Sequence, residues 1–63
     1  MKKLPYMVII TYEDGQFAGF FKTAEAAEQY RMDACVSLGY DAEVYGLRTV
    51  DDNPDPEYVF LYS

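Results

Sequence analysis

Two apolar runs separated by a turn signal open the chain. Residues 6–12 (YMVIITY) and 17–21 (FAGFF) are rich in β-branched and aromatic side chains, which is typical of strands. The pair Asp14-Gly15 between them favours a two-residue hairpin turn, because both central residues of such a turn need positive φ and these residue types tolerate it. We therefore predict an antiparallel hairpin in which Tyr12 pairs with Phe17.

The alternation of side chains assigns the two faces of this hairpin. One face is apolar or aromatic apart from a single glycine, and we predict that it faces the core. It carries Tyr6, Val8, Ile10, Tyr12, Phe17, Gly19 and Phe21. The opposite face is mixed, but it brings Met7, Ile9 and Phe20 together. Because an apolar cluster with polar surroundings is typical of a contact surface, we expect these three residues either to lie under a terminal segment or to form a homodimer interface.

The next segment predicts one helix. Residues 24–38 contain neither glycine nor proline, Thr23 precedes them as an N-cap, and Gly39 follows where a left-handed C-cap belongs. On a helical wheel one side is small or apolar, and it should face the sheet. That side carries Ala26, Ala27, Tyr30, Ala34 and Leu38. The alanines would allow the helix to lie close to the sheet, and aromatic rings of the sheet would fill the core between them.

Two further strands are predicted after the helix. Residues 41–50 alternate at first, with Ala42 and Val44 as the expected inward pair, and residues 58–62 (YVFLY) form another run of strand formers. A right-handed crossover through the helix sets the third strand parallel to the second, and the simplest arrangement places it beside the first. The predicted fold is therefore α+β, a single ββαββ domain over residues 1–63. Its four-stranded antiparallel sheet has the order 2-1-3-4, and one helix packs on one face.

Charge and composition narrow the classes of function. Eleven acidic and five basic residues give a net charge of -6, which repels nucleic acid phosphates and anionic lipid head groups. Direct binding to nucleic acid or to a membrane is therefore not expected. The apolar run at residues 7–10 is too short for a signal peptide or a transmembrane helix. Because Cys35 is the only cysteine, a reducing compartment is favoured, and we expect a cytoplasmic protein.

The sequence carries no catalytic or cofactor signature. There is no histidine to act as a general base or to partner Cys35, and the four glycines are isolated instead of forming a phosphate-binding loop. The adjacent carboxylates at Glu13-Asp14 and Asp51-Asp52 fall in predicted turns, where water screens them. We therefore expect no enzymatic activity and no cofactor.

The segment 51–57, DDNPDPE, holds four carboxylates and two prolines in seven residues. The D-x-N-x-D spacing at its start matches the opening of an EF-hand loop. However, Pro56 stands where that loop requires glycine, and Tyr62 stands at the position of its bidentate glutamate. We therefore predict no metal site, and we interpret the segment as a stiff, solvated connection between the last two strands.

Aromatic residues and acids together suggest a protein-binding role. The seven tyrosines are more than one small core can bury, and tyrosine beside carboxylates is typical of protein-binding surfaces. Small size, strong negative charge and absent catalytic groups are shared with many phage-type inhibitors and nucleic-acid mimics. The first hypothesis is thus a non-enzymatic module that inhibits or modulates a host protein through its basic surface, for instance that of a nucleic-acid-binding protein. The predicted contact residues are Glu13, Asp14, Asp51, Asp52, Asp55, Glu57, Tyr45 and Tyr58.

Two other functions remain open. The first is a homodimeric structural or adaptor domain that uses the face with Met7, Ile9 and Phe20. The second is a small glycan-binding or ligand-binding module that uses exposed tyrosines, and it depends on the aromatic content alone.

Overall fold

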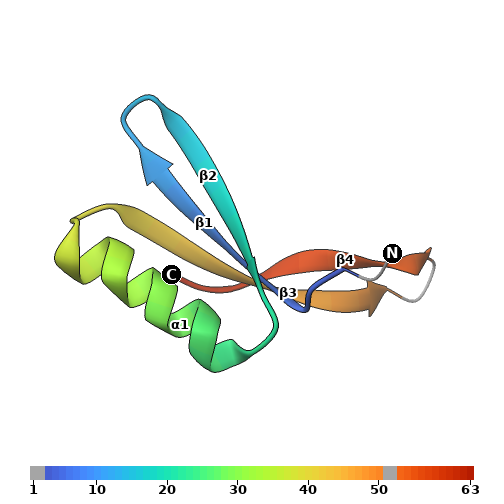
Figure 1. Ribbon diagram of the computed structural model, residues 1–63. Coiled ribbons are helices and arrows are strands. Elements are labelled where there is room, and N and C mark those ends of the chain that lie inside the picture. The colour runs from blue at the N-terminus through green and yellow to red at the C-terminus, as the bar shows by residue number, and fades with distance from the viewer. Residues whose placement is uncertain (1–2, 51–52) are drawn as a thin grey trace.

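A computed structural model describes residues 3–50 and 53–63 of the chain. In order, it contains β1 (Tyr6–Tyr12), β2 (Gly15–Phe21), α1 (Ala24–Met32), the π-helical segment η1 (Asp33–Ser37), β3 (Asp41–Val50) and β4 (Asn53–Tyr62). The strands form one antiparallel sheet in the order β2-β1-β3-β4, and α1 lies along one side of it (Figure 1). This arrangement confirms the predicted ββαββ fold.

The hairpin forms with a register different from the predicted one. Tyr12 pairs with Gly15, not with Phe17, and Ile10 pairs with Phe17. Among the described residues only glycines have positive φ, so Glu13 and Asp14 form the centre of the turn with negative φ and Gly15 follows with φ 155°. Glycine is favoured at the last position of a β-turn whose two central residues have negative φ. Because the register differs by two residues, every side chain stays on its predicted face.

The core lies between α1 and the middle of the sheet. Its buried side chains come from the two central strands and the helix, and they are Val8, Ile10, Ala27, Ala34, Ala42 and Val44. This confirms the inward pair predicted for the third strand. The alanines let the helix approach closely, and the bulk comes from rings at the margin, where those of Phe21 and Tyr30 lie 5.1 Å apart between centroids.

The helix begins as predicted but ends differently. The amide of Ala26 donates to Thr23 Oγ1 at 3.2 Å, and Gly39 has φ 74° beyond the helix. Between them, η1 widens the last turns, which rotates later residues relative to a regular α-helix. Cys35 therefore packs against the core, whereas Leu38 is 66% exposed. The prediction that Leu38 faces the sheet was wrong, and Ala26 at the margin of that side is exposed as well.

The acidic segment is mostly strand. β4 begins at Asn53 and pairs with Val50, and Glu57 pairs with Arg48, with an irregular register between them. The interpretation of residues 53–57 as a connection was therefore wrong. Proline is tolerated here because β4 is an edge strand, which needs ladder hydrogen bonds on one side only. Asp51 and Asp52 lie outside the described residues.

Candidate functional site

The sheet face opposite α1 carries an apolar row that crosses all four strands. Phe20 of β2 pairs with Met7 of β1, Met7 pairs with Tyr45 of β3, and Tyr45 pairs with Phe60 of β4. Directly opposed residues place their side chains on the same face with Cβ atoms about 4.5–5.5 Å apart. The face defined here as the open face consists of this row and its apolar neighbours: Met7, Ile9, Phe20, Tyr45, Leu47, Tyr58 and Phe60.

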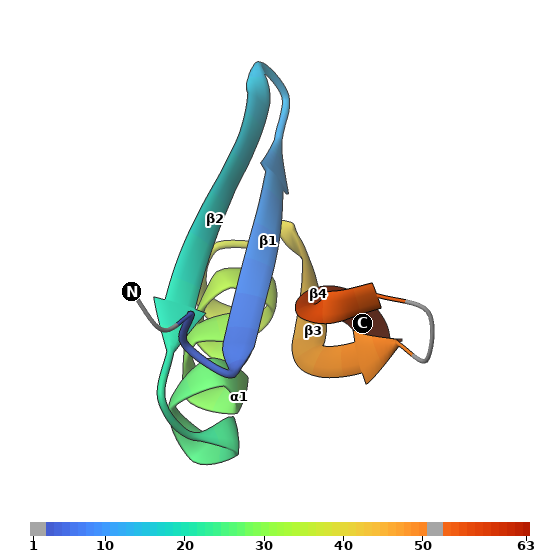
Figure 2. The same cartoon turned by 90° about the vertical axis from the view of Figure 1, so that its right-hand side faces the viewer.

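The open face is concave. Phe20 and Tyr58 belong to the two edge strands, which in a flat sheet would lie about 14 Å apart, three strand spacings. Their ring centroids are nevertheless only 5.7 Å apart. The sheet must therefore curl toward this face, and Figure 2 shows the far ends of β3 and β4 turning away from the β1–β2 hairpin. Curvature of this kind gathers the rings into one cluster.

Hydrogen bonding and ring contacts hold this cluster in place. The Tyr58 hydroxyl donates to the Leu4 carbonyl at 2.7 Å, and Lys3 Nζ lies 5.9 Å from the centre of the Tyr58 ring. Tyr45 and Phe60 meet edge to face with centroids 5.8 Å apart. Such contacts pre-order large side chains, which lowers the entropy lost when a partner binds.

Much of the open face is accessible to solvent. Phe20 is 50% exposed and Phe60 is 53% exposed, while the other five residues are half-buried. The described part of the N-terminal segment contacts Tyr58 and leaves both phenylalanines exposed. The expected covering by a terminal segment therefore does not extend to Phe20, whereas Met7 and Ile9 are half-buried. Exposed rings at such density are typical of a binding surface.

The structure brings together two sets of predicted residues that the sequence treated separately. Tyr45 and Tyr58, predicted as aromatic anchors, lie on the same face as the predicted dimer residues. Phe60 and Leu47 were missed. A signal for Phe60 was present, because it stands two residues after Tyr58 in a strand and therefore shares its face.

The predicted acidic contacts do not converge on one face. Glu13 and Asp14 lie in the β1–β2 turn, whereas Asp55 and Glu57 lie in β4 near the opposite extremity of the molecule (Figures 1 and 2). The molecule is 38 Å long in its largest dimension. The open face therefore lies between two acidic ends, and Asp51 and Asp52 fall outside the described residues.

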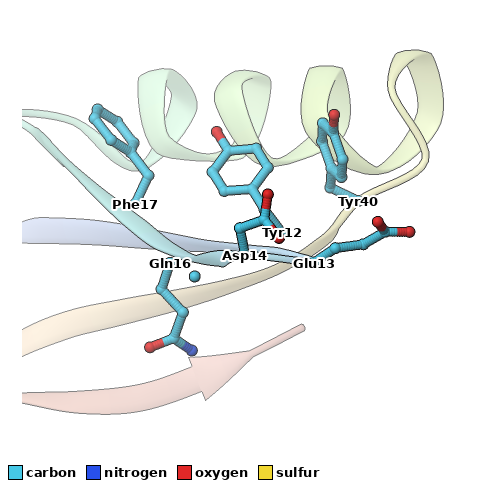
Figure 3. A pocket seen from close by; sticks show the side chains of 7 residues that line it. Tyr12, Glu13, Asp14, Gln16, Phe17 and Tyr40 are labelled. Atoms are coloured by element: carbon cyan, nitrogen blue, oxygen red, sulfur yellow. The ribbon is translucent and has the colours of Figure 1, made fainter.

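A second feature is an open cleft of about 710 Å³ at the tip of the hairpin, called the tip cleft below. Its lining residues are Tyr12, Glu13, Asp14, Gly15, Gln16, Phe17 and Tyr40. Figure 3 shows the rings of Tyr12, Phe17 and Tyr40 on one side of the strands and Gln16 on the other. Tyr12 and Phe17 were expected in the core. They face the helix side but stay exposed, because the tip of the hairpin extends beyond α1 (Figures 1 and 2).

A polar cluster ties the last strand to the helix. Arg31 donates to both carboxylate oxygens of Glu28, at 2.8 and 2.7 Å, and the Tyr62 hydroxyl donates to Glu28 Oε1 at 2.5 Å. The hydrogen bonds from Arg31 first, and then from Tyr62, lower the pKa of Glu28 to about 2. The same bond to Glu28 raises the pKa of Tyr62. A carboxylate held ionised in this way is a structural link, and the i,i+3 spacing of Glu28 and Arg31 was its only sequence signal.

The described residues also bear on metal binding and on membrane insertion. Within residues 3–50 and 53–63, no group of three His, Cys, Asp or Glu side chains lies together in a way that could hold a metal ion. No helix in the described part of the chain has the length and apolar character needed to cross a bilayer. The chain matches no protein-family model and is significantly similar to no curated protein sequence and no solved structure.

Proposed function

We propose that this protein is a non-enzymatic protein-binding module that inhibits or modulates a basic partner protein. The observation that carries the proposal is the open face, where rings from β2, β3 and β4 form an ordered and partly exposed cluster beside Met7 and Ile9 of β1. A single domain of 63 residues has little stability to spare, and an exposed apolar cluster on such a domain is typical of an interaction site. On this proposal, Tyr45, Tyr58, Phe20 and Phe60 supply the contact area.

A specific interface would occupy only a small part of this chain's surface. A standard interface buries roughly 800 Å² on each partner, which is about one sixth of the 4750 Å² surface of this chain. Large rings near the centre of an interface commonly supply most of its binding energy. The half-exposed rings of Phe20 and Phe60 are therefore the expected hot spots.

The charge distribution selects the kind of partner. Glu13 and Asp14 stand at one end of the open face, and Asp55 and Glu57 stand near the other. A partner with an apolar patch between basic residues complements this pattern, and nucleic-acid-binding proteins commonly carry basic surfaces. A protein bound to the basic surface of such a partner would prevent nucleic acid from binding to that surface. A cytoplasmic location belongs to the proposal because Cys35 is the only cysteine.

A homodimer through the open face is the second candidate, favoured by the continuous apolar row itself. Glu13 and Asp14 lie at one end of the molecule and Asp55 and Glu57 lie near the other, so a face-to-face pair with aligned long axes brings carboxylates near carboxylates. Screening by salt would strengthen this dimer, whereas it would weaken a complex with a basic partner. Light scattering at low and high salt therefore separates the two: a species of twice the chain mass that grows with salt supports the homodimer.

Capture of partners from a host lysate tests the proposal. The immobilised protein is compared with Phe60→Thr, which removes an exposed ring from the open face, and with Val36→Thr, which changes an apolar residue that is 77% exposed on the helix side. We expect basic proteins to be captured, to be lost with Phe60→Thr, to be retained with Val36→Thr and to elute as salt rises. Capture that is equal for both variants, or that involves no basic protein, contradicts the proposal.

A further inference from the structure

The rings of the tip cleft are unusually accessible. Phe17 is 52% exposed, and Tyr12 and Tyr40 are also exposed although they contact each other edge to face with centroids 4.7 Å apart. Three aromatic residues from different parts of the chain thus line one open cleft. The face of an aromatic ring carries partial negative charge and attracts cations.

Carboxylates next to these rings give the cleft a negative potential. Glu13 and Asp14 line it directly, and Asp41 lines an adjoining cleft that shares Tyr12, Glu13 and Tyr40 with it. In the part of the chain that the structure describes, neither Glu13 nor Asp14 makes an ion pair. Figure 3 shows the Asp14 carboxylate rising on the same side of the strands as the three rings. The occupant favoured by this combination is an organic cation.

We infer that the tip cleft binds the guanidinium group of an arginine side chain on the partner protein. This inference rests on the proposed function, which supplies a basic partner. Arginine is chosen over lysine because its planar group stacks on an aromatic face and donates two parallel hydrogen bonds to one carboxylate. The ring of Phe17 offers the stacking surface and Asp14 offers the acceptor, whereas the Glu13 side chain points away from Phe17 in Figure 3 and contributes negative charge.

The inference identifies a second contact point, separate from the open face. The three rings lie on the helix side of the strands, whereas Phe20, Met7, Tyr45 and Phe60 lie on the other side. A partner that uses both must reach around the free tip of the hairpin. The tip cleft then selects partners with an exposed arginine next to the apolar contact.

A titration with short peptides tests the assignment on the isolated protein. Backbone amide NMR spectra are recorded while acetyl-Gly-Arg-Gly-amide is added, and parallel titrations use peptides with lysine or with citrulline, a neutral analogue of arginine, in its place. We expect saturable shifts at Gly15 and Tyr40 with the arginine peptide, weaker shifts with lysine and none with citrulline. Equal shifts with citrulline, or no saturable shift at the tip, would overturn the inference. An equal effect of lysine would overturn the choice of arginine.

Variants locate the effect. The double substitution Glu13→Gln and Asp14→Asn removes two exposed charges at the turn, and we expect at least about a fivefold increase in the peptide Kd. Glu25→Gln with Asp33→Asn removes the same net charge from the helix and should leave the Kd unchanged. Phe17→Leu, which keeps an apolar side chain but removes the ring, should also raise the Kd. Equal effects of the two double variants would show general charge attraction and contradict a site.

The two claims fail separately. If the arginine peptide leaves the tip unaffected while Phe60→Thr still abolishes capture of basic proteins, the tip cleft assignment is wrong and the proposed function stands. If capture does not depend on Phe60 but the peptide binds at the tip, the proposed function is wrong and the cation site stands.

Discussion

Truncation of Phe60 tests whether the open face is accessible surface or part of a hidden core. Because the ring is 53% exposed, Phe60→Thr removes only about half of the stabilisation of a fully buried phenylalanine, roughly 1 kcal/mol. Loss of the edge-to-face contact with Tyr45 adds about 0.5–1.5 kcal/mol. Threonine keeps the β-branched shape that strands favour. We therefore expect the free energy of unfolding to fall by about 1.5–2.5 kcal/mol.

Ile10→Ala provides the comparison with the true core. Ile10 is 3% exposed in the central strand, so truncation removes buried methyl groups and leaves a cavity, at a cost of about 2–5 kcal/mol. A chain of 63 residues has a total stability of only roughly 3–5 kcal/mol. Ile10→Ala should therefore lose most of its stability and unfold at much lower urea concentration than Phe60→Thr.

Urea unfolding followed by far-ultraviolet circular dichroism measures both variants. Val36→Thr is the control, because an exposed substitution away from the core should change the free energy of unfolding by no more than about 0.5 kcal/mol. If Phe60→Thr costs as much as Ile10→Ala, the ring is a core element. The open face is then part of the core and is not a binding surface.

Three further predictions concern the helix and its links. The folded pKa of Glu28, about 2, lies below its ordinary value of 4.5, so its contribution to stability is complete above pH 4.5 and is lost as the pH falls through 2. Glu28→Gln should flatten this part of the curve of urea midpoint against pH, and an unchanged slope would contradict the link. Thr23→Ala removes the N-cap and should lower the free energy of unfolding, measured with urea, by about 1 kcal/mol. An unchanged urea midpoint would show that Thr23 does not cap the helix. Gly39→Ala should lower the free energy of unfolding by about 1–2 kcal/mol in the same assay, because alanine is strained at the left-handed φ of 74°. The added methyl group would meet no neighbouring atom, so a neutral result would argue against the left-handed conformation.

The sequence predicted the faces of the strands better than their registers. Period-two alternation placed Val8 and Ile10 inside and Met7 outside, and this assignment survived a register that differs by two residues. The exact turn was not predictable, because Asp14-Gly15 suits both the expected primed turn and an ordinary turn followed by glycine.

Two features of the fold depend on tertiary context. The wide turns at Asp33–Ser37 rotate Leu38 out of the core, and a helical wheel of fixed period cannot represent that change. Pro54 and Pro56 suggested a connection, since proline is rare within sheets. That rule does not apply to an edge strand, and the edge position of β4 follows only from the strand order.

The candidate site was predicted in parts. Met7, Ile9 and Phe20 followed from alternation within one hairpin, and Tyr45 and Tyr58 followed from the aromatic content. That they form one face depends on the pairing of β3 with β4 and on the curl that joins the two edge strands, neither of which is local in sequence. The tip cleft was missed because Tyr40 follows the helix and reaches the hairpin only in three dimensions.

Methyl NMR of the methionines shows whether a captured partner binds to the open face. Met7 lies on the open face, and Met32 is exposed at the end of α1 on the other side of the sheet, so the two side chains report on opposite faces. Spectra of the protein with methyl-labelled methionine are recorded as the captured basic partner is added. If the partner binds to the open face, the Met7 signal shifts or broadens while the Met32 signal is unchanged. A change at Met32 with an unperturbed Met7 would contradict it.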